Sequence, residues 1–132
     1  MDNSLTPLDW LKRAKSNLSR GKECDNLDLR EVFIEDLCFD LQQSTEKSFK
    51  ALLLYKGIDF PKTHSISRLI NLLKKYSIKV PDNVVDSAEL TQYSVETRYP
   101  DNYRKVTKEE YEEAVELAET VYNWVKEQIK PS

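Results

Sequence analysis

Residues 33–57 read FIEDLCFDLQQSTEKSFKALLLYKG, and this stretch decides the fold. It contains no proline, and no glycine before Gly57, which is typical of one long helix. At 100° per residue one broad face collects Leu37, Cys38, Leu41, Thr45, Ser48, Phe49 and Leu52. The opposite face is polar and carries Asp40, Gln43, Lys47 and Lys50. We therefore expect a central helix from about residue 30 to 56, ended by Gly57 in the left-handed conformation.

Small side chains occupy the middle of the apolar face of this helix, namely Ser44, Thr45, Ser48 and Ala51. They would let a second helix approach closely. Glu46 stands four residues before Lys50, which is the favourable order for an ion pair along a helix. This pattern indicates the central element of an all-α bundle.

Four further helices are predicted at residues 7–20, 65–76, 82–98 and 108–130. Their expected caps are Thr6 with Asp9, Ser65, either Asp82 or Asn83, and Thr107 with Glu110. Pro100 disfavours a helical residue before it, so the fourth helix should end at about Arg98. No stretch alternates with a period of two. The expected fold is an all-α, five-helix, mostly antiparallel up-and-down bundle.

The first and last of these helices carry clear apolar stripes. In the first helix, the residues expected to face inward are Leu8, Leu11, Ala14 and Leu18, with Trp10 beside them. In the last helix they are Tyr111, Ala114, Leu117, Ala118, Val121, Tyr122, Val125 and Ile129. Such stripes predict that both helices pack against the central one.

Composition narrows the function classes. The 132 residues are 39% hydrophobic and 33% charged, as expected for a single domain covering 1–132 with its core in 7–130. A net charge of −3 gives no general attraction to nucleic acid or membrane, and two glycines exclude a glycine-rich phosphate loop. One histidine and two cysteines, Cys24 and Cys38, argue against a zinc site, and no cofactor is implied.

The chain has neither a signal-peptide core at its start nor an apolar run long enough to span a membrane. We therefore expect a cytoplasmic protein with free thiols and no membrane partner.

Several motifs follow one another over roughly residues 8–130. The central helix supplies C-F-x-L-Q-Q-x-x-E-K-x-x-K-A-L-L from Cys38 to Leu53. It is followed by PKTHS at residues 61–65, TRYPD at 97–101 and an alanine-rich last helix with Trp124, and it is preceded by W-L-x-x-A. In this order the motifs resemble the HEPN domain family. The resemblance implies a compact helical bundle that commonly self-associates, so a homodimer is expected.

The resemblance also implies partners and activities. HEPN proteins are often encoded beside a minimal nucleotidyltransferase, as in prokaryotic toxin–antitoxin pairs. Related domains fused to kanamycin-type nucleotidyltransferases help to shape a substrate site. A large branch of the family consists of metal-independent ribonucleases with an R-x(4–6)-H motif.

This sequence departs from the ribonuclease branch. Its single histidine, His64, would need an arginine at position 57, 58 or 59, which are Gly57, Ile58 and Asp59. Arg98 is followed by YPDNYRKV, without a histidine. The cleavage chemistry uses an imidazole for proton transfer and a guanidinium for the phosphate. The chain therefore resembles an RYP-type HEPN protein, for which binding of a nucleotide or a partner is the better hypothesis.

The candidate ligand-binding residues are Gln43, Glu46, Lys47, Lys50, His64, Arg98, Tyr99 and Asp101. Each also has a structural interpretation. Arg98 could clamp a phosphate or form a salt bridge, and Tyr99 could stack on a base or pack in the core. His64 could exchange protons or contact a ligand, or it could cap a helix. Asp101 could simply be a turn residue.

We expect the polar side of the central helix and residues 97–101 to face one shared cavity or interface. Lys47, Lys50 and Arg98 would then attract an anionic group, while Glu46 orients one of these cations. Two functions remain open. The first is a dimeric binding module that pairs with a minimal nucleotidyltransferase or binds a nucleotide. The second is an unconventional ribonuclease or toxin that acts on RNA, using Arg98 with a residue other than histidine.

Overall fold

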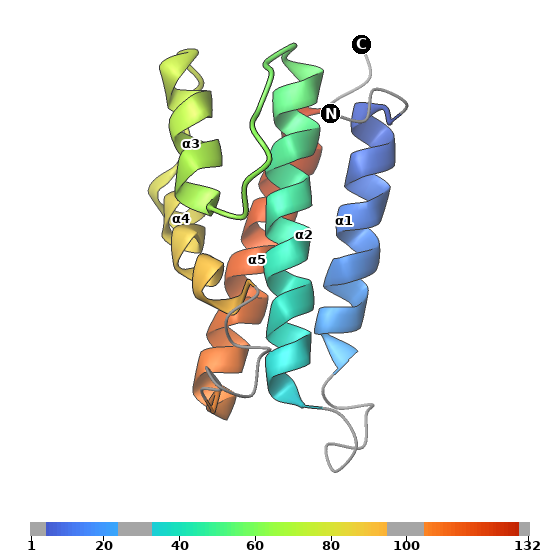
Figure 1. Ribbon diagram of the computed structural model, residues 1–132, viewed down its shortest axis with the longest axis vertical. Coiled ribbons are helices and arrows are strands. Elements are labelled where there is room, and N and C mark those ends of the chain that lie inside the picture. Colours follow the sequence, from blue (N-terminus) through green and yellow to red (C-terminus); the bar gives the residue numbers. More distant parts are fainter. Residues whose placement is uncertain (1–4, 24–32, 95–104, 130–132) are drawn as a thin grey trace.

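The computed structural model describes residues 5–23, 33–94 and 105–129. Within these ranges the chain is helical and has no strand, which confirms the all-α fold (Figure 1). The helices are α1 (Pro7–Gly21), α2 (Ile34–Tyr55), α3 (Ile66–Lys75), α4 (Asp82–Val85), the 3₁₀-helix η2 (Asp86–Tyr93) and α5 (Lys108–Gln128). None of the helices in the described ranges is long and apolar enough to cross a membrane.

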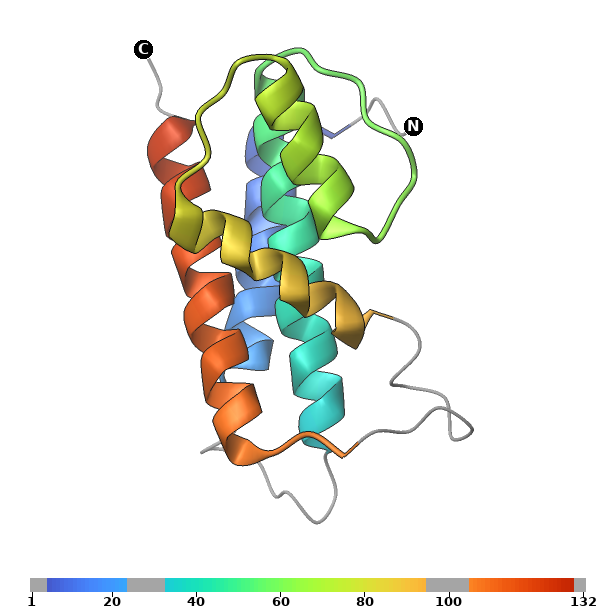
Figure 2. The same ribbon diagram turned by 90° about the vertical axis from the view of Figure 1, so that its left-hand side faces the viewer.

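Helix α2 lies at the centre of the bundle and packs against α1, α3, η2 and α5. Helices α1 and α2 run antiparallel, whereas α2 and α3 run in the same direction (Figures 1 and 2). Between these two, the chain at residues 56–65 returns along α2 before α3 begins. This return places the linker and its polar residues beside the polar side of α2.

Local sequence accounts for most helix ends. Thr6 with Asp9 and Thr107 with Glu110 form the predicted capping boxes, and the Ser65 hydroxyl accepts from the backbone of Arg68. Gly57 follows α2 with φ of 73°, as expected for a left-handed residue after a helix. Helix α2 begins at Ile34 after an extended Phe33, so the predicted start near residue 30 was too early.

The fourth helix departs from the prediction of one helix over 82–98. It is α-helical for only four residues and continues as η2, while residues 95–98 lie outside the described ranges. Asp82 or Asn83 as its cap was wrong, because Pro81 holds that position without a side-chain hydrogen bond. The Ser87 hydroxyl donates to the Val84 carbonyl at 2.6 Å. This local bond competes with the α-helical pattern and favours the tighter turn.

The predicted apolar face of α2 is buried along its whole length. The small residues in its middle, Ser44, Thr45, Ser48 and Ala51, are also fully buried. Helix α1 comes so near that a Cβ on Gly21 would lie 2.6 Å from Leu41 Cδ2. Helix α2 therefore contributes side chains to the core along its length, with α1 packed closely against it.

One predicted core residue was wrong, since Leu8 is 57% exposed. At 100° per residue it lies about 90° from the centre of the stripe formed by Leu11, Ala14 and Leu18, all of which are buried. Leu117 on α5 and Leu72 on α3 are only partly buried. The remaining inward residues predicted for α5 are buried.

Candidate functional site

Glu46 on α2 is the centre of a cluster of polar side chains. Its Oε1 accepts from Lys50 Nζ at 2.7 Å, which confirms the predicted pair along the helix. Its Oε2 lies 3.1 Å from His64 Nδ1 and accepts from Gln42 Nε2 at 2.9 Å. Gln43 Nε2 donates to Gln42 Oε1 at 2.8 Å. We call these five residues the Glu46 cluster.

The linker after α2 brings His64 into this cluster. Thr63 Oγ1 accepts from the backbone of Ser65 at 3.0 Å, and Thr91 Oγ1 on η2 accepts from the first amide of α3 at 3.1 Å. The His64 carbonyl also lies 3.5 Å from Gln42 Nε2. These contacts fix the backbone on both sides of the imidazole, and its ring stays 56% exposed.

Burial and charge act in opposite directions on Glu46, which is only 4% exposed. Burial on its own raises the pKa of this carboxyl group. Hydrogen bonds from Lys50 and His64, together with the charge of Lys50, outweigh burial and hold its pKa below the ordinary value. The carboxylate is therefore ionised at neutral pH and can orient both partners.

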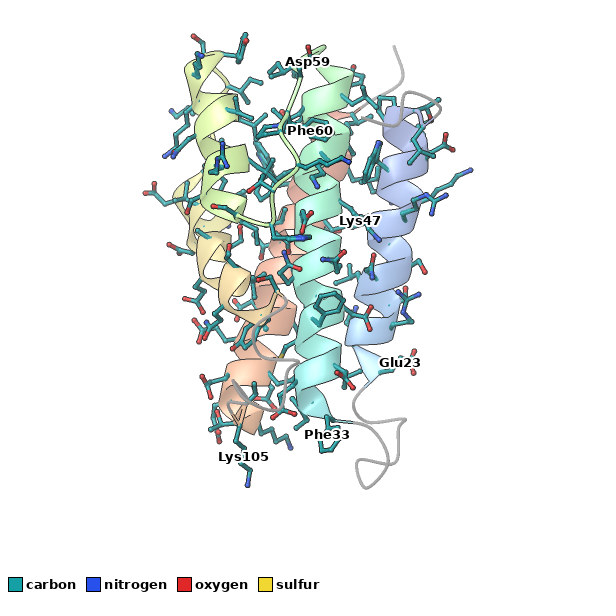
Figure 3. All side chains as sticks on the ribbon, viewed as in Figure 1. Glu23, Phe33, Lys47, Asp59, Phe60 and Lys105 are labelled. Atoms are coloured by element: carbon teal, nitrogen blue, oxygen red, sulfur yellow. The ribbon has the colours of Figure 1, made fainter. Side chains whose placement is uncertain are left out.

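Lys50 sits between the carboxylate and two aromatic rings. Its Nζ lies 6.0 Å from the centre of the Trp10 ring and 5.8 Å from that of Phe60. The two rings meet edge to face, with 6.3 Å between their centres. A cation is attracted to the faces of such rings, so they help to hold the ammonium group in place. Figure 3 shows Phe60 on the linker beside the upper part of α2.

Lys47 belongs to a different set of contacts and points toward α1 (Figure 3). Its Nζ donates to Asn17 Oδ1 at 2.8 Å, and Asn17 Nδ2 donates to Asp40 Oδ1 at 2.9 Å. Arg20 also binds Asp40, at 3.1 Å. Burial lowers the pKa of Lys47, and the nearby charge of Arg20 lowers it further. Lys47 therefore ties α2 to α1.

The structure thus brings together Gln43, Glu46, Lys50 and His64, while Lys47 faces another helix. The remaining candidates, Arg98, Tyr99 and Asp101, lie outside the described residues. A cavity shared by the polar side of α2 and residues 97–101 therefore stays a prediction.

Sequence reasoning missed Gln42, although it is fully buried and bonds both Glu46 and the His64 carbonyl. The signal was a second glutamine on the apolar side of α2, where an unpaired amide would be costly. It also missed a groove of about 360 Å³ on α3, lined by Pro61, Arg68, Asn71, Leu72 and Lys75. The available signal was the lack of any acidic residue between positions 60 and 81.

Comparison with known proteins shows which family the chain resembles. The family model described as "HEPN domain" matches residues 8–128. A protein from Methanocaldococcus jannaschii, named "Putative toxin MJ1304", is 30% identical over 91% of this chain and 90% of its own length.

Two solved structures are similar over nearly the whole chain. ST0689, described as an archaeal HEPN homologue, has a TM-score of 0.73 at 30% identity, covering 96% of this chain and 99% of its own. TT1696 from Thermus thermophilus has a TM-score of 0.75 at 31% identity, covering 93% and 98%. With the family model matching most of the sequence and the fold agreeing, this chain belongs to the HEPN domain family.

Proposed function

We propose that this single-domain HEPN protein is a cytoplasmic binding subunit that forms a homodimer, pairs with a minimal nucleotidyltransferase and holds a nucleotide at the Glu46 cluster. The observation that carries the ligand site is the contact between Glu46 and His64. The buried carboxylate of Glu46 forms a hydrogen bond with Nδ1 of His64. The imidazole ring is exposed, and its Nε2 has no hydrogen bond among the described residues. A ligand can therefore reach Nε2 on an imidazole whose orientation is already fixed.

The neighbouring groups suit a nucleotide. Gln43 and Lys50 offer N–H donors of the kind that bind phosphate and ribose oxygens. Trp10 and Phe60 are partly buried and lie close to Lys50, so they offer apolar surface to a base. Arg98 and Tyr99, at the RYP-type motif, would add a guanidinium fork and a stacking surface, with Asp101 beside them.

The sequence favours binding over cleavage. No arginine stands at positions 57–59, where the ribonuclease motif would need one for His64, and no histidine follows Arg98. The imidazole therefore lacks the guanidinium that the ribonuclease motif supplies for the phosphate.

A thermal-shift screen with nucleoside mono-, di- and triphosphates tests the ligand site, because a ligand that binds only the folded chain raises Tm. We expect a rise for the wild-type chain, none for His64→Ala, and an unchanged rise for the control Lys79→Ala, whose side chain is exposed outside the cluster. If no nucleotide raises Tm, the site is refuted. Co-purification with a nucleotidyltransferase encoded beside this chain tests the partner separately.

A ribonuclease or toxin acting on RNA is the second candidate. The M. jannaschii relative is named as a toxin, and a carboxylate that holds Nδ1 of a histidine is an arrangement that general bases use. We expect the purified chain not to cleave single-stranded RNA in the presence of EDTA. Cleavage that disappears in His64→Ala or Arg98→Ala would place this candidate first.

A further inference from the structure

Charge is strongly segregated along this chain. Residues 60–81 contain five cations and no acidic residue, although the chain as a whole carries −3. The cations are Lys62, Arg68, Lys74, Lys75 and Lys79, and all five are exposed. Because most of these residues lie on α3 or beside it, one end of the molecule has a positively charged surface.

The groove on α3 lies within this positively charged surface. Arg68, Asn71, Leu72 and Lys75 follow the spacing i, i+3, i+4 and i+7, so they form one stripe along the helix. The two cations are about 10.5 Å apart along the axis. Pro61 and Leu72 give the groove an apolar floor between them. Among the described residues, neither cation has an ion-pair partner.

A complementary acidic surface lies on α5. Glu109, Glu112, Glu113 and Glu116 are exposed and follow the same spacing, i, i+3, i+4 and i+7. Glu109 and Glu116 are therefore also about 10.5 Å apart. We call this stripe the α5 acidic face.

The acidic face extends to η2, where it lacks compensating charge. Burial raises the pKa of Glu89, and the charge and hydrogen bond of Glu113 raise it further, with a smaller effect from Asp86. Among the described residues, none of these three carboxylates has an ion pair. A cation supplied from outside would relieve this repulsion.

We propose that two copies of the chain associate by placing the α3 groove of one on the α5 acidic face of the other. Arg68 and Lys75 then meet carboxylates with the same seven-residue spacing, and the floor at Leu72 is covered. Figure 2 shows α3 toward one end and the start of α5 at the opposite end, with η2 between them. A two-fold axis through the middle of this side makes the contact twice and closes the dimer.

The apolar floor and the matched spacing favour a helix as the occupant over a nucleic-acid backbone, which would leave Leu72 and Pro61 uncovered. This inference rests on the homodimer of the proposed function and specifies its interface.

The experiment uses sedimentation velocity on the full chain and two charge-reversed variants. The first is Arg68→Glu with Lys75→Glu, and the second is Glu109→Lys with Glu116→Lys. We expect the wild type at twice its 15.5 kDa mass. Each variant alone should dimerise at least about tenfold more weakly, because like charges then face one another. An equal mixture should recover dimers, since both contacts again pair opposite charges.

The control is Lys12→Glu with Lys126→Glu, which changes net charge as much as the first variant at two exposed positions outside both faces. It should dimerise like the wild type, and circular dichroism should show all variants folded. A monomeric wild type, charge-reversed variants that dimerise normally, or a mixture that recovers nothing would each overturn the proposed interface. Nucleotide binding is measured on the same variants, so its loss or retention is judged separately. Shifts with single-stranded RNA that depend on Arg68 would assign the groove to RNA instead.

Discussion

The Tyr111 hydroxyl on α5 donates a hydrogen bond to the Gly21 carbonyl at the end of α1, at 2.6 Å. The two residues are ninety positions apart, and both are buried. The bond satisfies a carbonyl in the last turn of a helix, where no further turn can supply a donor. It also ties the last helix of the bundle to the first.

Replacing Tyr111 by phenylalanine should therefore destabilise the fold. The buried carbonyl would lose its partner, at a cost of about 1–3 kcal/mol in the free energy of unfolding. Urea denaturation measures the change, with Tyr76→Phe as the control because that side chain is 56% exposed. A loss equal to that of the control would contradict the role given to this bond.

Substitution of two leucines tests which side chains form the core. Leu41 is fully buried, whereas Leu8 is 57% exposed. Leu41→Ala should cost about 2–5 kcal/mol, because truncation leaves a cavity. Leu8→Ala should change the free energy of unfolding by less than about 0.5 kcal/mol. Similar losses for both would show that the buried face of α1 or α2 has been misplaced.

The lowered pKa of Glu46 makes stability depend on pH in the acid range. Its ionised form is favoured by folding, so its contribution is present above the unfolded pKa and is lost as the pH falls through the lower folded value. Glu46→Gln should be less stable than the wild type at pH 7, and the difference should shrink below about pH 4. Unfolding curves at several pH values check this. A difference that does not change with pH would argue against it.

Glu89 should give stability the opposite dependence on pH. Its raised pKa means that folding disfavours the ionised carboxylate, so the penalty appears as the pH rises through the unfolded value and beyond. Glu89→Gln should therefore raise Tm at pH 7 and change it little at pH 3. Gln92→Glu, on an exposed neighbouring position, provides a comparison that adds charge to the same helix. A lower Tm for Glu89→Gln at pH 7 would refute the repulsion.

Features encoded within a few residues were predictable. The capping boxes at Thr6 and Thr107, the cap at Ser65, the turn at Gly57 and the pair between Glu46 and Lys50 all involve neighbours within four positions. Their geometry depends on local backbone conformation, which sequence patterns report directly.

Features that depend on distant parts of the chain could not be predicted from the sequence. The partner of Lys47 is Asn17, thirty residues earlier on α1, and periodicity on α2 cannot reveal it. The polar side of α2 therefore looked like one site, although its lysines serve different contacts. The change from α4 to η2 coincides with the hydrogen bond from the Ser87 hydroxyl to the Val84 carbonyl, and helix propensity does not include such a bond.

The position of α2 at the centre of the bundle determines how the molecule opens. Its amide hydrogens can exchange with solvent only when the helices around it separate together, so deuterium uptake there should track global unfolding. Helix α3 has its major contacts with α2 and η2, so we expect it to detach before the rest of the bundle unfolds. The chain should therefore show two rates of exchange, and the faster one belongs to the helix that carries the basic groove.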